Sequence, residues 1–376
     1  IVACKGYFFA VDFVDDQANP LPLASLVKTL VKCQHIAKEQ ESLNMPKAVG
    51  WLSGCNRDLW ASSLNKLTRY ESFEKALKVL ESGAFVLCLD ETTPETESDA
   101  SEFFWDGKGV LGCNRFFDKS VNIMVNRLGQ AALLGEHSMM DGSIPMVICN
   151  QLQKFKYARL NSASLRLASP DKRIEDVEVL DIFGDCWKDE DLTNLANRLG
   201  EFGRKQYMEL ADSVELKTIV HKDYGKQFIK KGGVSPDAFM QLVLQLAAYR
   251  CFGKQIATYE ATQTRQFVHG RTETARTVSI DSKAFVEAMG LKSVADSHDT
   301  DAKQDKLKLL IQAAESHHEY TRSACKGLGV DRHFLGLSLV TREDEELPDL
   351  FKDPVFTRSK TWRLSTSGLP SCPGFG

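Results

Sequence analysis

Long apolar runs, paired cysteine motifs and a strong excess of either charge are all missing from this sequence. Apolar stretches such as residues 84–89 are much shorter than the roughly 20 residues of a membrane-spanning helix, so we expect no transmembrane segment. The ten cysteines are scattered singly, without a C-x-x-C pair, which argues against a zinc ribbon or a disulfide framework and fits a reducing compartment. A net charge of −4 gives no reason to expect a nucleic-acid partner.

The length of 376 residues predicts two domains or one large one, and 43% hydrophobic residues are ordinary for a globular chain. A polar, weakly patterned stretch covers residues 162–185, and we place the domain boundary at its end. The predicted domains are therefore 1–185 and 186–376. No repeat of solenoid period and no low-complexity segment is present.

Hydrophobic periodicity predicts alternating strands and helices. Strands are expected at 7–14, 85–89, 121–125 and 131–135, the last two joined as a hairpin. Helices are expected at 23–42, 188–216, 236–267, 282–290 and 303–325. The pattern therefore predicts several strands in the first half of the chain and mainly helices in the second.

The helix that begins at Pro236 has the clearest start signal. Ser235 suits the N-cap, Pro236 the first helical position, and Asp237 complements the helix dipole. The lysines just upstream are Lys222, Lys226, Lys230 and Lys231. A basic loop that runs into a helix N-terminus suits a phosphate-bearing ligand, although on composition alone a solvated lysine cluster is the favoured explanation.

His137 is the residue best placed for acid–base chemistry. It follows the apolar run 131–135 and enters a turn that contains Asp141 and Gly142. Histidine titrates near neutrality, so it can accept and return a proton at physiological pH. An isolated histidine and aspartate in a turn are also compatible with a purely structural role, so the assignment depends on the surrounding motifs.

Several motifs occur in order along nearly the whole chain. They are V-G-W-L with Arg57 and W-A at 49–61, N-R-F-F-D-K at 114–119, E-H-S-M-M-D-G at 136–142, S-P-D-A-F at 235–239 followed by Q-L-A and Y-R, T-Y-E at 258–260, G-R-T-E-T at 270–274, D-R-H at 331–333 and L-S-T-S at 364–367. Together they resemble the carnitine/choline acyltransferase family. No single motif is decisive, but their conjunction is highly specific.

The resemblance implies two α/β domains like chloramphenicol acetyltransferase, with mixed sheets flanked by helices and the active site between them. It implies acyl transfer between coenzyme A and carnitine, with His137 as the general base and acid. Asp141 would pair with Arg271, or form an ordinary ion pair without effect on the base, and Ser367 would stabilise the oxyanion. The carnitine hydroxyl itself attacks, so no cysteine or serine nucleophile and no permanent cofactor or metal is expected.

The resemblance also separates carnitine from choline, which lacks a carboxylate. Tyr259, Thr272, Arg332 and Ser365 match the positions that hold this carboxylate, and choline enzymes differ at the threonine and the arginine. An arginine fork suits a carboxylate well, so we expect L-carnitine as acceptor. By the same resemblance Lys226, Lys230 and Asp237 contact CoA.

Departures from the family pattern leave a second hypothesis open. Gly368 stands where carnitine enzymes usually have glutamine, and the family pattern continues beyond both ends of this chain. We expect that the chain is truncated at both ends. We also expect a short-chain enzyme that prefers acetyl groups. The alternative is a non-catalytic or truncated relative that binds CoA or a partner without turnover. A histidine–aspartate hydrolase ranks third, because no G-x-S-x-G is present. Family members are mitochondrial or peroxisomal, and a monomer is expected.

Overall fold

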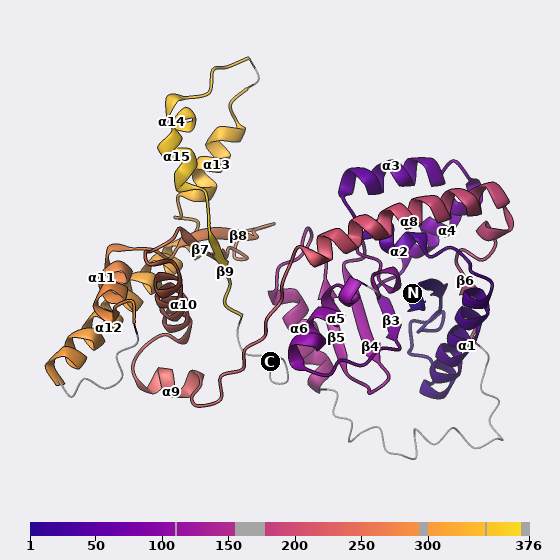
Figure 1. Cartoon of the computed structure of the whole chain (residues 1–376), viewed down its shortest axis with the longest axis horizontal. Helices are drawn as coiled ribbons and strands as arrows, with labels where there is room; N and C mark the ends of the chain where they lie inside the picture. Colours follow the sequence, from indigo (N-terminus) through magenta and orange to yellow (C-terminus); the bar gives the residue numbers. More distant parts are fainter. Residues whose placement is uncertain (110, 155–176, 293–299, 343, 370–376) are drawn as a thin grey trace. The chain divides into compact units, whose positions relative to one another are not determined.

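The structure, a computed structural model, describes residues 1–109, 111–154, 177–292, 300–342 and 344–369. By residue contacts the chain divides between Ile219 and Val220 into two compact units, here called unit 1 and unit 2 (Figure 1). Each unit combines helices with a mixed sheet, as the sequence predicts. The predicted boundary at 185/186 lies earlier in the chain, and the assignment of separate functions to domains 1–185 and 186–376 stays a prediction.

Unit 1 is built on a six-stranded sheet with the strand order β5-β4-β3-β1-β2-β6. The strands are β1 (Val2–Cys4), β2 (Tyr7–Ala10), β3 (Val86–Asp90), β4 (Val121–Asn126), β5 (Ala131–Gly135) and β6 (Leu180–Asp181). The helices are α1 (Leu23–Ser42), α2 (Ala48–Ser53), α3 (Arg57–Leu67), α4 (Glu71–Ser82), α5 (Glu97–Trp105), α6 (Ser143–Lys154) and α8 (Glu190–Asp212). Parallel pairing of β1 with β3 and β3 with β4 joins the antiparallel hairpins β1–β2 and β4–β5.

Alternating side chains of the central strands enter two separate cores. Ala3 and Phe8 pack in a cluster with buried residues of α2, α3, α4 and α8, such as Trp60. Val2 and Phe9 pack on the other side against Cys33 and other residues of α1. Because side chains alternate along a strand, this division shows that helices cover both faces of the sheet.

The N-R-F-F-D-K segment fixes the middle of unit 1 through buried polar contacts. Arg115 is fully buried and donates from Nη1 and Nη2 to the two carboxylate oxygens of Asp90, at 2.9 and 2.8 Å. Asn114 accepts from the amide of Gly6 and donates to Asp90. Lys119 donates to the backbone carbonyl oxygens of Glu81, in the last turn of α4, and of Gly83, just after it. These residues therefore connect β1, β3 and α4 around the core.

Unit 2 contains a three-stranded sheet with the order β8-β7-β9. The strands are β7 (Thr258–Gln263), β8 (Thr272–Arg276) and β9 (Leu364–Thr366), and the helices are α9 (Lys226–Lys231), α10 (Pro236–Phe252), α11 (Ile280–Met289), α12 (Thr300–Cys325), α13 (Asp331–Leu339), α14 (Asp349–Lys352) and α15 (Pro354–Ser359). β7 is antiparallel to β8 and parallel to β9. Its main core joins α10, α11 and α12 through residues such as Leu242, Val286 and Ala313.

The predicted helix over 236–267 is correct at its start and wrong at its end. The Ser235 hydroxyl accepts a hydrogen bond from the Ala238 amide, and Pro236 occupies the first turn, as expected. The helix ends at Phe252 because Gly253 adopts a left-handed conformation with φ of 68°. The following T-Y-E-A-T-Q segment alternates buried and partly buried side chains and forms β7 instead.

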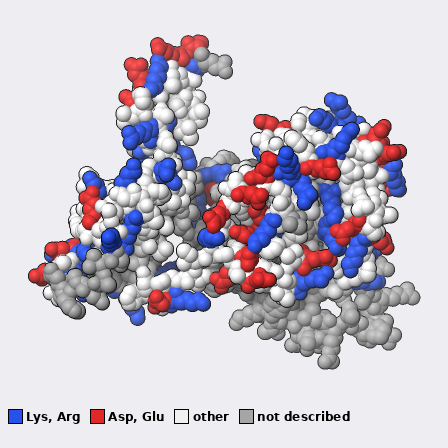
Figure 2. All heavy atoms as spheres, viewed as in Figure 1, with Lys and Arg blue, Asp and Glu red and all other residues white. Residues whose placement is uncertain are grey.

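Acidic and basic side chains are interspersed on the face of unit 1 that Figure 2 shows. This mixture agrees with the small net charge of −4. In the described part of the chain, no helix combines the length and apolar character needed to cross a bilayer.

Candidate active site

His137 lies in the turn between β5 and α6, as the sequence predicts. The Glu136 amide donates to the Ser120 carbonyl at 3.0 Å, which fixes the exit of β5. The Glu136 carboxylate then accepts from the Ser138 amide at 2.9 Å. On the far side of the turn, Asp141 and Gly142 accept backbone hydrogen bonds from the first turn of α6. The histidine is thus held between two anchored segments.

The imidazole of His137 is accessible and faces an acidic neighbour. Its side chain is 78% exposed, and Nδ1 lies 3.6 Å from Oδ1 of Asp141. That distance is within ion-pair range but longer than a good hydrogen bond. A carboxylate beside Nδ1 favours a proton on that nitrogen, which leaves Nε2 as the basic atom. The role of His137 as general base stays a prediction.

Two of the predicted carnitine-binding residues are neighbours across the sheet of unit 2. Tyr259 on β7 is in register with Ser365 on β9. The Tyr259 ring packs on Trp362, with ring centroids 5.2 Å apart. Arg276, which is opposite Tyr259 on β8, lies over the same tryptophan. The aromatic contact fixes Tyr259 next to the serine-containing strand.

Arg332, at the start of α13, and Thr272, on β8, form a second pair of predicted residues. The Arg332 Nε donates to the backbone carbonyl of Thr272 at 2.8 Å. The Arg332 amide donates to the buried carboxylate of Glu273 at 3.2 Å. The preceding residue, Asp331, accepts two hydrogen bonds from Arg276 at 2.8 and 3.0 Å. The N-terminus of α13 is therefore tied to β8, with Arg332 exposed beside Thr272.

Ser367 directly follows β9, and the residues on either side of it, Thr366 and Gly368, both pack closely against other parts of unit 2. The Thr366 hydroxyl donates to Gln241 on α10 and lies equally close to the Tyr259 carbonyl, both at 2.9 Å. At Gly368 a Cβ atom would lie 2.3 Å from Oδ1 of Asp237. The backbone after Ser367 therefore runs against the N-terminal turn of α10, where a side chain has no room.

The two predicted CoA lysines are on the short helix α9. Lys226 and Lys230 are four residues apart, so they are on the same face of this helix, and both are exposed. The segment from Gly232 to Ser235 then leads directly into α10 and Asp237. All three predicted CoA contacts thus belong to one continuous segment of the chain.

The structure also brings together Asp237, Glu260 and His317, of which only Asp237 was predicted as a site residue. Burial by itself lowers the pKa of His317, but the carboxylates of Asp237 and Glu260 outweigh it and raise the pKa to about 9. The ligand atoms of the three residues lie within 4.8 Å of one another. A cation could bridge such atoms, but a protonated imidazole between two carboxylates accounts for the same spacing. The expectation of no metal stays a prediction.

Sequence reasoning missed His317 because it lies in a helix whose pattern is otherwise ordinary. Glu260 is part of the T-Y-E motif, and a glutamate at a buried position of a β-strand needs a partner. That requirement is the signal that could have led to a search for a buried basic residue. The sequence alone does not indicate which histidine or lysine supplies it.

Buried thiols support the expectation that cysteine is not the nucleophile. Burial raises the pKa of Cys4 and Cys113 to about 11, and of Cys33 and Cys88 to about 12. Since the thiolate is the reactive form, these four residues are unreactive at neutral pH.

The predicted site residues are divided between the two units. His137 and Asp141 belong to unit 1, whereas the other nine predicted residues belong to unit 2. Within unit 2, Tyr259, Thr272 and Ser365 are on the three strands of one sheet, and Arg332 at the start of α13 bonds Thr272. Thr272 is opposite Gln263, four residues along β7 from Tyr259, so the structure forms two pairs, Tyr259 with Ser365 and Thr272 with Arg332. The pairing of Asp141 with Arg271, and an active site between the domains, stay predictions.

Comparison with known proteins identifies the family. The family model for choline/carnitine O-acyltransferases matches residues 1–376. The chain is 33% identical to the mitochondrial carnitine O-acetyltransferase of Saccharomyces cerevisiae over 98% of its length and 53% of that protein. It is 31% identical to carnitine O-palmitoyltransferase 2 of Rattus norvegicus, covering 99% of this chain and 53% of the relative. Choline O-acetyltransferase of Sus scrofa is 30% identical, with 99% and 56% covered.

With a family model over its whole length and the family's motifs on the described elements, the chain belongs to the choline/carnitine O-acyltransferase family. The predicted family is thereby confirmed. The chain spans about half the length of the curated relatives it matches. These relatives are named for different acceptors and acyl groups, so family membership alone does not define the substrate.

Proposed function

We propose that this protein is a carnitine O-acyltransferase that moves a short acyl group reversibly between CoA and L-carnitine. The observation that carries the proposal is the placement of Tyr259, Thr272 and Ser365 on the three strands of the sheet of unit 2, with Arg332 bonded to Thr272 from the start of α13. These residues come from three strands and a helix N-terminus that are far apart in sequence. Their association with one small sheet, as the pairs Tyr259–Ser365 and Thr272–Arg332, supports a shared role in carnitine binding, with the carboxylate at Arg332.

Arg332 is the residue that distinguishes carnitine from choline in this proposal. Its Nε donates to the Thr272 carbonyl, and its Nη groups are the donors that would bind the carboxylate. A charge-assisted, forked interaction of this kind is stronger and more specific than a single lysine contact. Thr272 and Ser365 would add hydroxyl donors, and Tyr259 would supply a phenol.

His137 acts as the general base in the proposed reaction. Its Nε2 takes the proton of the carnitine hydroxyl while that oxygen attacks the thioester carbonyl of acyl-CoA. The tetrahedral intermediate then loses the CoA thiolate as the C–S bond breaks, and the same imidazole gives the thiolate its proton. Positioned proton transfer contributes about 10²–10⁴-fold to the rate. Asp141, 3.6 Å from Nδ1, would hold the imidazole in the required tautomer.

Ser367 stabilises the negative charge that develops on the carbonyl oxygen in this scheme. The hydrogen bonds of Thr366 support a fixed position for the serine that follows. Loss of one such donor typically costs about 10²–10³-fold in turnover. Arg271 would pair with Asp141 and so connect the histidine turn with the G-R-T-E-T segment.

Acyl-CoA binds along α9 and the start of α10 in the proposal. Lys226 and Lys230 contact the phosphate region, and Asp237 accepts hydrogen bonds from the adenine–pantetheine part. Acetyl is the proposed acyl group, because the relative with the highest identity among those named above is an acetyltransferase. Two of these relatives are named as mitochondrial, which supports a mitochondrial location for this protein.

The test measures the release of CoA thiol from acetyl-CoA with L-carnitine or choline as acceptor. Thiol release with carnitine, together with much slower release with choline, is the expected result. Octanoyl-CoA and palmitoyl-CoA in parallel define the acyl preference. A folded protein that binds CoA but is inactive with both acceptors would instead support the alternative, a relative that binds CoA or a partner without turnover.

A further inference from the structure

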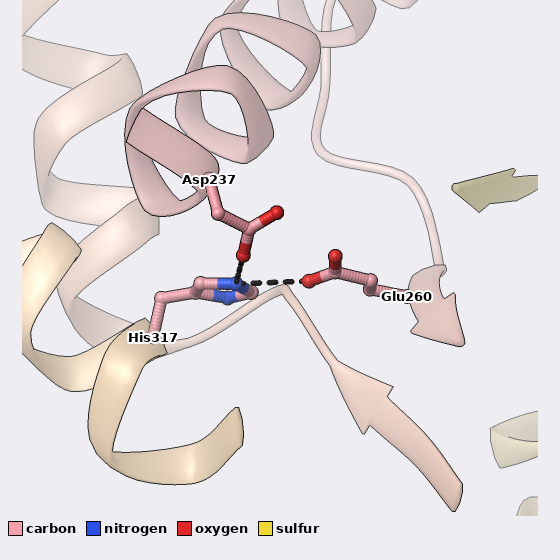
Figure 3. A group of neighbouring side chains, drawn as sticks. All are labelled: Asp237, Glu260 and His317. Carbon is pink, nitrogen blue, oxygen red and sulfur yellow. Dashed lines mark hydrogen bonds and ion pairs between the residues drawn. The ribbon is translucent and has the colours of Figure 1, made fainter. Parts of the chain in front are cut away.

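His317 connects two carboxylates that come from different elements of unit 2. Asp237 is in the first turn of α10, Glu260 is on β7 and His317 is on α12 (Figure 3). The His317 Nε2 lies 3.0 Å from Oε2 of Glu260 and 3.7 Å from Oδ2 of Asp237. The Thr321 hydroxyl is 3.4 Å from the same nitrogen. One ring nitrogen therefore serves both acids.

The three side chains differ in their access to solvent. Those of His317 and Glu260 are each only 6% exposed, whereas that of Asp237 is 44% exposed. A buried carboxylate needs a partner of opposite charge, because its desolvation is otherwise too costly. His317 supplies this partner to Glu260 and at the same time contacts the accessible acid. Asp237 is thus the member of the group that a ligand can reach.

The cluster adjoins the end of the S-T-S segment. A Cβ atom at Gly368 would lie 2.3 Å from Oδ1 of Asp237 and 3.2 Å from Oε1 of Glu260. These are the carboxylate oxygens other than the two that face His317. The position of Gly368 therefore connects the cluster with Ser367, the residue before it.

We propose that His317 is a positioning residue for acyl-CoA, whose positive charge compensates Asp237 and Glu260 so that the polyanionic ligand can bind beside them. This inference rests on the proposed function. With His317 protonated, the three groups carry a net charge of −1; with a neutral imidazole they carry −2. The second unit of negative charge would repel the phosphates of CoA and release Asp237 from its position.

The charged and titratable groups around His317 come from every element packed on it. Asp237 of α10 and Glu260 of β7 contact it directly. On α12, the charge of His318 acts on Asp237, and burial together with the charge of Glu260 raises the pKa of Cys325. Farther along α12, Gln312 bonds Asp281 of α11, and Tyr320 faces Glu273 and Arg276 of β8 and Asp331 of α13. The two carboxylates that raise the pKa of His317 to about 9 are the nearest of these.

The substitution that separates charge from hydrogen bonding is His317→Gln. Glutamine keeps a donor near the position of Nε2 but has no positive charge. We expect the Kd for acetyl-CoA to increase about tenfold at pH 7.5, as the loss of one nearby compensating charge implies. The Kd for L-carnitine should stay unchanged. His35→Gln, which alters an exposed histidine of α1, is the control and should bind acetyl-CoA like the wild type.

A pH titration of acetyl-CoA binding gives a second readout that needs no variant. In the wild type, the Kd should be constant from pH 7 to 8 and should rise as the pH passes about 9, where His317 loses its proton. In His317→Gln this rise of the Kd should be absent. Chelation of metal ions with EDTA should leave the Kd for acetyl-CoA of both proteins unchanged.

Each outcome discriminates between the possibilities. The role of His317 would be overturned, with the proposed function left intact, by either of two results. In the first, folded His317→Gln binds acetyl-CoA as tightly as the wild type. In the second, the Kd of the variant still rises near pH 9. Loss of wild-type binding with EDTA would assign the cluster to a metal instead and would also overturn this role. If the variant does not fold, a wild-type Kd that stays flat through pH 9 refutes the inference. Failure of the wild type to bind acetyl-CoA at all would overturn the proposed function, and this inference with it.

Discussion

The Nε of Arg332 donates to the backbone carbonyl of Thr272 at 2.8 Å, across 60 residues of sequence. The same residue is held through its amide by Glu273, and its neighbour Asp331 is held by Arg276. A guanidinium fixed through Nε presents its Nη edge in one orientation, which lowers the entropic cost of binding a carboxylate.

Replacement of Arg332 by asparagine tests this role. The substitution removes a charge-assisted contact of about 1.5–3 kcal/mol, so the KM for L-carnitine should increase about 10- to 100-fold. The KM for acetyl-CoA should change far less. Arg342→Asn is a suitable control, because Arg342 is exposed and pairs with Glu345. Steady-state kinetics with near-normal carnitine saturation in Arg332→Asn would remove this residue from carboxylate binding.

Lys226 and Lys230 of α9 should attract the phosphates of CoA electrostatically. In the double variant Lys226→Gln with Lys230→Gln, we expect the KM for acetyl-CoA to rise about tenfold at low salt, because exposed charges act through a screened field. The difference from wild type should shrink as salt is added. Lys283→Gln, which alters an exposed lysine of α11, serves as control. A salt-independent difference would argue against electrostatic recognition of the phosphates.

The buried pair of Arg115 and Asp90 should be essential for the stability of unit 1. Asp90→Asn leaves a buried guanidinium without its countercharge, which typically costs about 3–5 kcal/mol. We expect a large decrease in the urea midpoint of unfolding. Glu71→Gln removes an exposed ion pair with Lys75 and should leave the midpoint unchanged. A midpoint for Asp90→Asn equal to that of the wild type would show that the pair does not stabilise the fold.

Stability should also depend on the pH through His317. Its pKa is raised from 6.5 to about 9 in the folded chain. The protonated imidazole therefore contributes stability that is fully present below pH 6.5 and is lost as the pH rises through 9, amounting to about 3 kcal/mol or less. Urea unfolding at several pH values should show a decline between 6.5 and 9 in the wild type that is absent in His317→Gln. A parallel decline in both proteins would assign it to other groups.

Local signals in the sequence were sufficient for much of the fold. Helix α1 and the β4–β5 hairpin have the predicted bounds within a residue, because apolar periodicity and turn residues agree there. The error at residues 253–267 has a tertiary cause. Residues 258–263 pair with β8 on one side and β9 on the other, and pairing with such distant segments is not visible in local hydropathy.

The candidate site, like the fold, could be predicted only in part from the sequence. The family motifs identified individual residues, but some of these support the fold: Arg115 and Asn114 of N-R-F-F-D-K are buried structural groups. Conversely, His317 has no local signal. Its importance follows only from the packing of α12 against α10 and β7, contacts between segments 57 and more residues apart.

The most direct test of the proposed chemistry compares acetyl transfer from acetyl-CoA to L-carnitine by the wild type and by His137→Ala. Our account predicts a loss of about 10²–10⁴-fold in kcat with an unchanged Kd for acetyl-CoA. His35→Ala, an exposed histidine of α1, should retain full activity. A His137→Ala variant that still transfers acetyl groups at a rate close to that of the wild type would contradict the account.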